Sequence, residues 1–446
     1  MIQSLIAIVG AAHVSTDRDV LAARSVDWTG RYRGQASALV RPGSAEQVAA
    51  VLAACREAGA YVTVQGGRTS LVAGTVPEHD DVLLSTERLT TLGEVDLVRR
   101  RIRAGAGVSL AGVQHAAAAA GLLMGVDLAS RDSATVGGLA ATNAGGLRTV
   151  RYGPMRDQVD GIEVALADGS VLRRHSAVRS DNTGYDLASL MIGSEGTLGV
   201  ITEVDIGLYP IPSHHTAALC GFADLDALIA AGIALREVEN VTALELVDGR
   251  AAELAAEHLD VAVPVSADWL LLVELAGDTE QTGRLAVALE GLRLCADPAV
   301  GIDAPARQRL WAVRESLTEV TALFGAPLKF DVALAHPAIA GFTRDAAALI
   351  ARHAPDALPI MFGHIGEGNL HLNVLRCTAE QETALYTPMM ELIGAHGGNV
   401  SSEHGVGTLK RAYLSMSRTP SDIAAMRAIK AAFDPDGYLN AAVLFD

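Results

Sequence analysis

The sequence predicts a globular protein that mixes helices with strands and divides into two or three domains. Its 446 residues are enough for several domains with substantial cores, and half of them are hydrophobic. The 44 glycines form no low-complexity tract, which favours a globular α/β chain over a disordered or fibrous one. The formal net charge of −17 argues against nucleic acid as a partner.

The cysteines and the first residues exclude several other classes. Cys55, Cys220, Cys295 and Cys377 stand far apart and form no C-x-x-C pair. Iron–sulfur clusters and a disulfide framework are therefore not expected. The apolar start at 5–12 is too short to span a bilayer and lacks a basic leader. We interpret it as the first helix or strand of a cytoplasmic protein.

A glycine loop follows the first well-marked helix and strand. A capping box at 44–47 predicts a helix that ends at Gly59, and residues 61–64 predict a strand. The loop 65–74, Gln-Gly-Gly-Arg-Thr-Ser-Leu-Val-Ala-Gly, comes next. Backbone N–H groups in such a turn can bind a pyrophosphate. Taken alone, the same pattern fits an ordinary turn.

Two further glycine-rich runs support a cofactor site. Residues 134–146 are almost all small, and a packed core would not leave so much side-chain volume unfilled. A flat ligand lying on the backbone would supply the missing bulk. Residues 193–202 again turn from glycines into a predicted strand. Three such runs within about 140 residues predict one extended cofactor site.

Nicotinamide and ATP sites fail a direct test. Gly105 and Gly107 precede a helix-like segment, but Leu110 occupies the place of the third glycine in G-x-G-x-x-G. Close packing of the helix over a pyrophosphate needs a small residue there. The sequence also contains no G-x-x-x-x-G-K-[ST]. Binding of NAD or ATP is therefore not expected.

Polar residues concentrate in the second half, at 362–374, Phe-Gly-His-Ile-Gly-Glu-Gly-Asn-Leu-His-Leu-Asn-Val. Its glycines disfavour a helix and predict a loop, carrying His364, that runs into a strand. On that strand His371 and Asn373 face one way and Leu372 faces the core.

The same stretch supplies candidate metal ligands. His364 and His371, with Glu403 from the later Ser-Glu-His-Gly run, suit a catalytic Zn²⁺ with an open coordination position. Glu367 is the alternative carboxylate. Because the spacing matches no standard metal motif such as H-E-x-x-H, a set of hydrogen-bonded polar residues beneath a loop is the competing interpretation.

Four motifs in combination resemble a known family: residues 181–187, 192–199, 364–371 and 403–405. They resemble FAD-linked 2-hydroxyacid dehydrogenases of the vanillyl-alcohol oxidase type, and most of all the D-2-hydroxyglutarate dehydrogenases. The resemblance extends over nearly the whole chain.

The resemblance implies an α+β fold. It comprises a two-part FAD-binding domain at 1–210, an antiparallel-sheet cap domain for substrate at 211–400, and a C-terminal helical segment at 401–446 that returns to the FAD domain.

The resemblance also implies which residues hold FAD. The chain departs from the family at Gly67-Arg68-Thr69-Ser70, where relatives carry G-G-N-T-G, and after Asn440, where the usual lysine of N-P-G-K is missing. The first loop has no histidine or cysteine, so we expect non-covalent FAD. The expected FAD-binding residues are Gln65, Gly66, Gly67, Arg68, Thr69, Ser70, Gly74, Thr135, Gly138, Thr142, Asn143, Gly146, Glu195, Gly199, Ile201 and Asn440.

A helix predicted at 305–324 carries Arg314 and Thr318 on one face, and Lys329 follows on a short predicted strand. Read alone, Arg314 fits a solvated helical charge. The resemblance instead implies that this trio binds the distal carboxylate of a dicarboxylate, for which arginine offers a bidentate fork. Asn373 and His404 complete the expected substrate contacts.

These residues suggest a mechanism for oxidising D-2-hydroxyglutarate to 2-oxoglutarate. The metal would lower the pKa of the substrate hydroxyl, His404 would remove the proton as general base, and a hydride would pass to flavin N5. Glu403 and His404 are adjacent and cannot face the same way on a strand, so a bend is needed there, which Gly405 permits.

Other readings stay open at this point. Relatives of the same type oxidise D-lactate, glycolate or D-malate, and a flavin protein of this scaffold can act as a non-redox transferase on a glycerol-phosphate-type ester. A zinc hydrolase without flavin is more distant. The metal could be Mn²⁺, Fe²⁺ or Co²⁺ instead of zinc. The electron acceptor is expected to be an electron-transfer flavoprotein, a quinone or a cytochrome, and a homodimer is possible.

Overall fold

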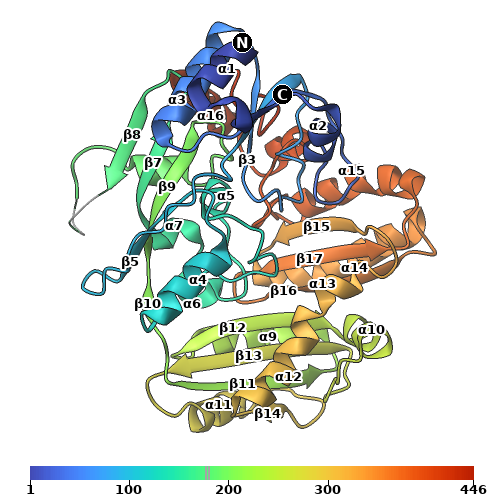
Figure 1. Ribbon diagram of the computed structural model, residues 1–446. Coiled ribbons are helices and arrows are strands. Elements are labelled where there is room, and N and C mark those ends of the chain that lie inside the picture. Colours follow the sequence, from blue (N-terminus) through green and yellow to red (C-terminus); the bar gives the residue numbers. More distant parts are fainter. Residues whose placement is uncertain (176–177, 179–180, 446) are drawn as a thin grey trace. The chain divides into compact units, whose positions relative to one another are not determined.

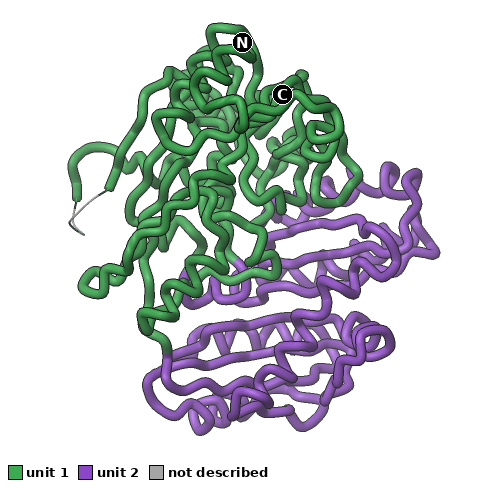
Figure 2. Tube along the Cα trace, viewed as in Figure 1, with its two compact units in different colours: residues 1–145, 153–211, 403–446 green, residues 146–152, 212–402 purple. Residues whose placement is uncertain are grey.

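The computed structural model describes residues 1–175, 178 and 181–445. It divides into two compact units (Figure 2). Unit 1 comprises residues 1–145, 153–211 and 403–446, and unit 2 comprises residues 146–152 and 212–402. The chain therefore leaves unit 1 and returns to it, and the short segment 146–152 groups with unit 2.

Unit 1 contains two four-stranded sheets, in the orders β1-β2-β4-β3 and β5-β9-β7-β8 (Figure 1). In the first sheet β4 runs parallel to both β2 and β3, while the second sheet is antiparallel throughout. The strands of unit 1 are β1 Val14–Ser15, β2 Ala36–Val40, β3 Val62–Gln65, β4 Asp80–Ser85, β5 Arg101–Gly105, β6 Leu122–Leu123, β7 Val159–Ala165, β8 Val171–His175, β9 Val200–Gly207 and β10 Tyr209–Pro210.

Several helices of unit 1 pack against these two sheets. One buried cluster joins α3 to strands of both sheets, and another packs α4 and α5 on the second sheet. The α-helices of unit 1 are α1 Ile2–Val9, α2 Arg18–Arg24, α3 Ala45–Glu57, α4 Leu110–Ala119, α5 Val136–Thr142, α7 Met155–Gln158, α8 Leu187–Met191 and α16 Pro420–Phe433. Short 3₁₀ turns lie at Ala11–His13 and Arg411–Met416.

Unit 2 is built on one antiparallel seven-stranded sheet in the order β14-β11-β13-β12-β16-β17-β15. Its strands are β11 His214–Phe222, β12 Val241–Asp248, β13 Trp269–Gly277, β14 Ala299–Gly301, β15 Leu328–Ala333, β16 Leu358–His364 and β17 Asn369–Leu375. Its helices are α6 Thr149–Tyr152, α9 Leu225–Arg236, α10 Gly249–Leu259, α11 Thr282–Leu289, α12 Ala304–Glu315, α13 Leu317–Val320, α14 His336–His353 and α15 Ala379–Ala395.

One face of this sheet carries most of the polar residues discussed below. Alternate residues of a strand share a face, and the cluster that contains Val247 of β12, Phe362 of β16 and Leu375 of β17 also contains residues of α10, α12 and α13. Those helices therefore cover that face. Glu245, His364 and His371 lie on it as well, because each is an even number of residues from a member of the cluster on its own strand.

Several predicted elements are confirmed. The helix predicted after the capping box is α3, whose N-cap Ser44 accepts a hydrogen bond from Gln47 N at 3.2 Å, and the predicted strand after it is β3. The capping box is only half formed, because Gln47 Oε1 accepts from Gly43 N at 2.7 Å instead of from Ser44. Gly59 adopts a φ of 63° just past the helix, as a helix C-terminus requires.

The single helix predicted at 305–324 is wrong. The structure has α12, which ends at Glu315, and a separate turn of helix, α13. Ser316 lies between them and donates its hydroxyl to the carbonyl of Val313 at 3.1 Å. A serine hydroxyl that bonds back to the preceding turn competes with the helical ladder, and the apolar spacing of the sequence does not reveal this.

Among the described residues, no helix is long and apolar enough to cross a membrane.

The stability of unit 2 should depend on pH through Asp248, the N-cap of α10, whose carboxylate accepts from Arg250 N at 2.9 Å. Burial raises the pKa of Asp248 from its ordinary value of 3.8 to about 6. Between these values the folded protein holds the proton more tightly than the unfolded chain, so stability falls as pH rises through that window. Asp248→Asn keeps the cap and should stabilise the protein at pH 7.5 by about 1–3 kcal/mol.

Urea unfolding at several pH values measures this. The gain from Asp248→Asn should shrink below pH 6 and vanish near pH 4, where both states carry the proton. Asp224→Asn is the matched control, because Asp224 caps α9 in the same way, through Ala227 N at 2.7 Å, with a side chain that is 47% exposed. A gain that is equal at all pH values would contradict the burial argument.

Candidate active site

The two predicted histidine ligands lie on a β-hairpin. His364 is the last residue of β16 and His371 lies on β17, so the expectation that His364 comes from a loop is wrong. The turn 365–368 is tight because Gly368 has a φ of 73°, and a Cβ on it would lie 2.2 Å from the carbonyl oxygen of Leu334. Only glycine fits there, so the chain turns directly after His364 and re-enters the sheet at Asn369.

The two imidazoles face a common point. Their ring centroids are 5.4 Å apart, with ring planes at 89°. Together with Glu403 they offer three ligand atoms that all lie within 4.8 Å of one another. Two imidazoles and one carboxylate in this space fit a zinc ion. The alternative carboxylate, Glu367, is exposed in the hairpin turn and belongs to neither candidate group of the described residues.

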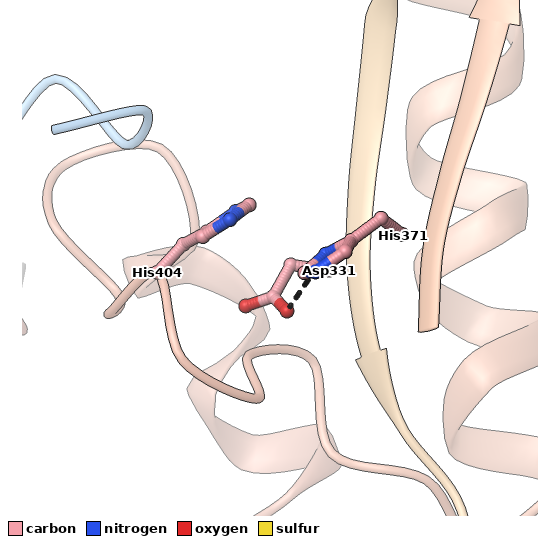
Figure 3. Close-up of side chains that lie close together, drawn as sticks. All are labelled: Asp331, His371 and His404. Atoms are coloured by element: carbon pink, nitrogen blue, oxygen red, sulfur yellow. Dashed lines mark ion pairs between the residues drawn. The ribbon is translucent and has the colours of Figure 1, made fainter. Parts of the chain in front are cut away.

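A second, overlapping group shares His371. Asp331, His371 and His404 also present ligand atoms within 4.8 Å of one another. Figure 3 shows His371 and Asp331 facing each other, with His404 on the loop beside them. His371 Nδ1 lies 3.8 Å from Asp331 Oδ1. The same histidine can thus serve as ligand in one group and pair with a carboxylate in the other.

The chain bends where Glu403 and His404 stand. Ser402 N donates to Asp331 Oδ2 at 2.9 Å, which fixes the chain beside β15 just before Glu403. Residues 402–404 form a bend, and Gly405 follows with a φ of 85°. The predicted bend is therefore confirmed. It leaves His404 Nε2 3.8 Å from Glu403 Oε1.

Glu195 fixes the far end of this bend. Its two carboxylate oxygens accept from Val406 N at 2.9 Å and Gly407 N at 2.8 Å. Burial raises the pKa of Glu195, although these two hydrogen bonds and the charge of Lys410 oppose the shift. Glu195 is one of the residues expected to bind FAD, and in the structure its side chain anchors the segment that follows His404.

The expected substrate residues other than His404 lie in unit 2. Lys329 of β15 pairs in register with Asn373 of β17, and Asp331 pairs with His371, so all four side chains share one face of the sheet. Arg314 at the end of α12 is buried, with its guanidinium 4.7 Å from the centre of the Phe362 ring.

This burial rules out the solvated reading of Arg314. Arg314 Nε donates to Glu245 Oε2 at 2.7 Å. Thr318 lies beyond the helix break, on α13, and is half-buried.

The first two glycine runs come together in unit 1. A Cβ on Gly66 would lie 2.7 Å from Thr135 Oγ1, and a Cβ on Gly67 would lie 2.0 Å from the carbonyl oxygen of Ser133. The two backbones therefore touch where the side chains are missing. Thr135 Oγ1 and Gln65 Oε1 are buried without a hydrogen-bond partner among the described residues. Such atoms call for a partner, and the polar groups of a bound FAD would supply one.

Other residues expected to bind FAD hold these runs in place. Asn440 Oδ1 accepts from Val64 N at 2.8 Å, and Asn440 Nδ2 donates to the Glu195 carbonyl at 2.7 Å. Gln65 Nε2 donates to the carbonyls of Arg24 and Thr75. Arg68 has a φ of 56° and donates to the carbonyl of Ala23.

The remaining members of that set have mainly structural surroundings. Asn143 ends α5 with a φ of 53° and accepts from Arg156 N at 2.9 Å. Thr142 Oγ1 bonds back to the carbonyl of Gly138. Gly199 and Ile201 are buried, and Ile201 belongs to an apolar cluster. Ser70 Oγ accepts from Val72 N, and Thr69 lies beside Ser70 in the same loop. Gly74 packs against Gly407. Gly146 has a φ of 114°.

Sequence reasoning missed two buried carboxylates at the site, Glu245 and Asp331. Glu245 is 1% exposed and its Oε1 lies 2.7 Å from His364 Nδ1. Asp331 is 2% exposed. A signal was present, because Glu245 stands in the otherwise apolar run Ala-Leu-Glu-Leu-Val. A charge in the middle of a buried strand is rare unless it is paired.

Comparison with known proteins identifies the family of the chain. A family model described as FAD binding domain matches residues 36–174, and one described as FAD linked oxidases, C-terminal domain, matches residues 211–444. The chain is 37% identical to mitochondrial D-2-hydroxyglutarate dehydrogenase of Bos taurus, over 96% of this chain and 80% of that one. It is 33% identical to D-2-hydroxyglutarate dehydrogenase of Stutzerimonas stutzeri, over 100% and 98%.

Solved structures share the fold at low identity. p-Cresol methylhydroxylase with bound substrate has a TM-score of 0.81 at 16% identity, covering 100% of this chain and 96% of that one. The 4-ethylphenol oxidase of Gulosibacter chungangensis has a TM-score of 0.78, with the same identity and coverage. These likenesses confirm the predicted α+β fold of the vanillyl-alcohol oxidase type. By its domains and its relatives, the chain belongs to the FAD-linked D-2-hydroxyglutarate dehydrogenase family, FAD-dependent oxidoreductases that act on a CH–OH donor.

Proposed function

We propose that the protein oxidises D-2-hydroxyglutarate to 2-oxoglutarate and that it needs a divalent metal, with zinc the first choice, besides FAD. The observation that supports the metal is the convergence of His364, His371 and Glu403, whose ligand atoms lie within 4.8 Å of one another. The relatives named for this substrate support the choice of acid.

The bound groups supply two kinds of chemistry. Zinc provides Lewis acidity at the substrate hydroxyl, and FAD provides the hydride acceptor at N5. The protein itself positions the acid and moves the proton. His404 takes the hydroxyl proton as general base. Its position beside His371, which belongs to both candidate groups, supports this role.

The far end of the substrate carries a second carboxylate. We propose that Arg314, Thr318 and Lys329 bind it and that Asn373 orients the carboxylate next to the reacting carbon. Lys329 and Asn373 lie opposite each other on adjacent strands. Binding energy at the remote end aligns the reacting carbon. For the reduced flavin we propose an electron-transfer flavoprotein or a quinone as acceptor, and a homodimer as the assembly.

Anaerobic titration of the purified protein tests the function. D-2-hydroxyglutarate, D-malate and D-lactate are added in turn while the flavin band at about 450 nm is followed, before and after chelation. D-2-hydroxyglutarate should bleach the flavin fastest, chelation should slow bleaching, and added zinc should restore it. Faster bleaching by D-lactate would contradict D-2-hydroxyglutarate as the substrate. Equal bleaching rates before and after chelation would contradict the need for a metal. No bleaching by any 2-hydroxy acid would contradict the dehydrogenase activity itself.

Lys329→Met should change substrate choice. Loss of one charge-assisted hydrogen bond to the distal carboxylate should lower kcat/KM for D-2-hydroxyglutarate by about 10–100-fold. D-lactate has no distal carboxylate, so its kcat/KM should not change. Steady-state kinetics with both acids measures the effect.

Arg309→Met is the control for that variant, since Arg309 is an exposed cation on α12 of the same unit and its loss should affect neither acid. An equal loss on both acids in Lys329→Met would instead indicate a general distortion of the site.

A further inference from the structure

Two buried glutamates lie on neighbouring strands of the seven-stranded sheet. Glu245 of β12 is 1% exposed and Glu274 of β13 is 7% exposed. Each bonds to a residue of α12 and faces a histidine of a neighbouring strand. Glu245 bonds to Arg314 and His364, both at 2.7 Å, whereas Glu274 bonds to Trp311 at 2.6 Å and faces His215 at 3.4 Å.

The contacts of Glu245 fix the orientation of the His364 ring. Glu245 Oε2 accepts from Arg314 Nε, and Glu245 Oε1 lies 2.7 Å from His364 Nδ1. A carboxylate beside one ring nitrogen of a metal-binding histidine orients the ring so that its other nitrogen faces the metal. In His364 that other nitrogen is Nε2.

The same carboxylate orients Arg314. It holds the Nε edge of the guanidinium, while the Phe362 ring lies 4.7 Å from the guanidinium carbon. With Nε engaged and one face on the ring, the two terminal amino groups are left to point at another acceptor. A planar guanidinium held along one edge has little freedom to turn.

We propose that Glu245 is a positioning residue that couples the metal to the grip on the distal carboxylate. One oxygen fixes the metal-binding nitrogen of His364 and the other fixes the direction of Arg314. The inference rests on the proposed function, since it takes His364 as a zinc ligand and Arg314 as a substrate contact. It assigns to one buried side chain the alignment of both ends of the substrate.

Glu245→Gln tests the coupling at nearly constant volume. An amide offers one acceptor oxygen and one donor group, so it can accept from His364 or from Arg314 but not from both. The zinc dissociation constant of the purified holoenzyme, measured by metal content in zinc-buffered solutions, should rise about 10–100-fold. KM for D-2-hydroxyglutarate should rise while KM for D-lactate changes less, because only the former uses Arg314.

Glu274→Gln is the matched control. It changes a buried glutamate on the next strand that also bonds to α12 and faces a histidine, but that histidine, His215, belongs to neither candidate metal group found among the described residues. Its zinc affinity should equal that of the wild type. Flavin content and the unfolding midpoint of each variant establish that it folds. If Glu245→Gln fails to fold, Glu245→Asp retains the charge beside Arg314 but cannot reach both partners, and should weaken zinc binding about tenfold.

The possible outcomes separate the two proposals. Equal zinc affinity in the wild type and the folded Glu245 variants overturns the coupling and leaves the proposed function standing. An equal loss in Glu274→Gln also overturns the coupling, since the effect would then be general to this face of the sheet. A wild type that holds no zinc overturns the zinc assignment in the proposed function and the coupling together, whereas the flavin titration tests the oxidation of D-2-hydroxyglutarate separately.

Discussion

Replacing His404 by glutamine is expected to lower kcat for D-2-hydroxyglutarate by about 10²–10⁴-fold while zinc and FAD stay bound. The amide of glutamine cannot take up the proton that leaves the substrate hydroxyl, although it keeps a polar side chain of similar reach. Because glutamine retains a polar contact to the substrate but cannot accept the proton, kcat should fall far more than KM changes. Stopped-flow measurement of flavin reduction at saturating substrate gives the rate, and metal analysis of the same sample gives the zinc content.

His396→Gln is the control for this prediction. Both histidines are about one-fifth exposed and lie beside a carboxylate, His404 at 3.8 Å from Glu403 and His396 at 2.9 Å from Asp345. His396→Gln should reduce flavin at the wild-type rate. Loss of zinc from His404→Gln would contradict the assignment of a base, and would mean that the metal is held by the second group, through Asp331, His371 and His404.

The second large effect is expected when His364 or His371 is replaced by alanine. Each change removes an imidazole ligand, so zinc should be lost on dialysis. The rate of flavin reduction should fall by at least about 100-fold, since Lewis-acid stabilisation is worth several kcal/mol. Bound FAD should be retained. Metal content and the single-turnover rate are measured on the same preparations.

The pair of variants also decides which group holds the metal. Both groups contain His371 but only one contains His364. Loss of zinc from both variants supports His364, His371 and Glu403 as the ligands, whereas loss from His371→Ala alone would assign the metal to the other group. His215→Ala, which removes a histidine beside the buried Glu274 on the same sheet, should retain zinc.

Local patterns made much of this site predictable. The glycines and the alternation of residues 369–375 indicated a tight turn followed by a strand, and they placed His371 and Asn373 on one face. Gly405 indicated the bend after His404. These signals work because turn geometry and strand periodicity are properties of a few consecutive residues. His364 was wrongly assigned to the loop because the end of a strand depends on its pairing with a neighbouring strand, and its own residues do not reveal that pairing.

Contacts between distant segments were not predictable. Glu245 meets His364 across 119 residues and Glu195 meets Val406 across 211. Nothing local says that strands β12 and β16 are neighbours in the sheet. The bond from the guanidinium of Arg68 to the carbonyl of Ala23 in α2 is a further contact that the local sequence does not reveal. The family resemblance supplied FAD and the substrate, and spacing alone did not.

The long separations within the seven-stranded sheet bear on when the proposed metal would be acquired. A ligand nitrogen positioned by Glu245 exists only after β12 has paired with β16, and such distant pairings form slowly during folding. A zinc ion bound as proposed would therefore be loaded into a sheet that has already formed. The His364 side chain is 6% exposed, whereas those of Glu403 and His404 are 22% and 21% exposed, so an entering ion would meet this bend first. Protein made in metal-poor medium should accordingly be folded and yellow, and ready to be activated afterwards.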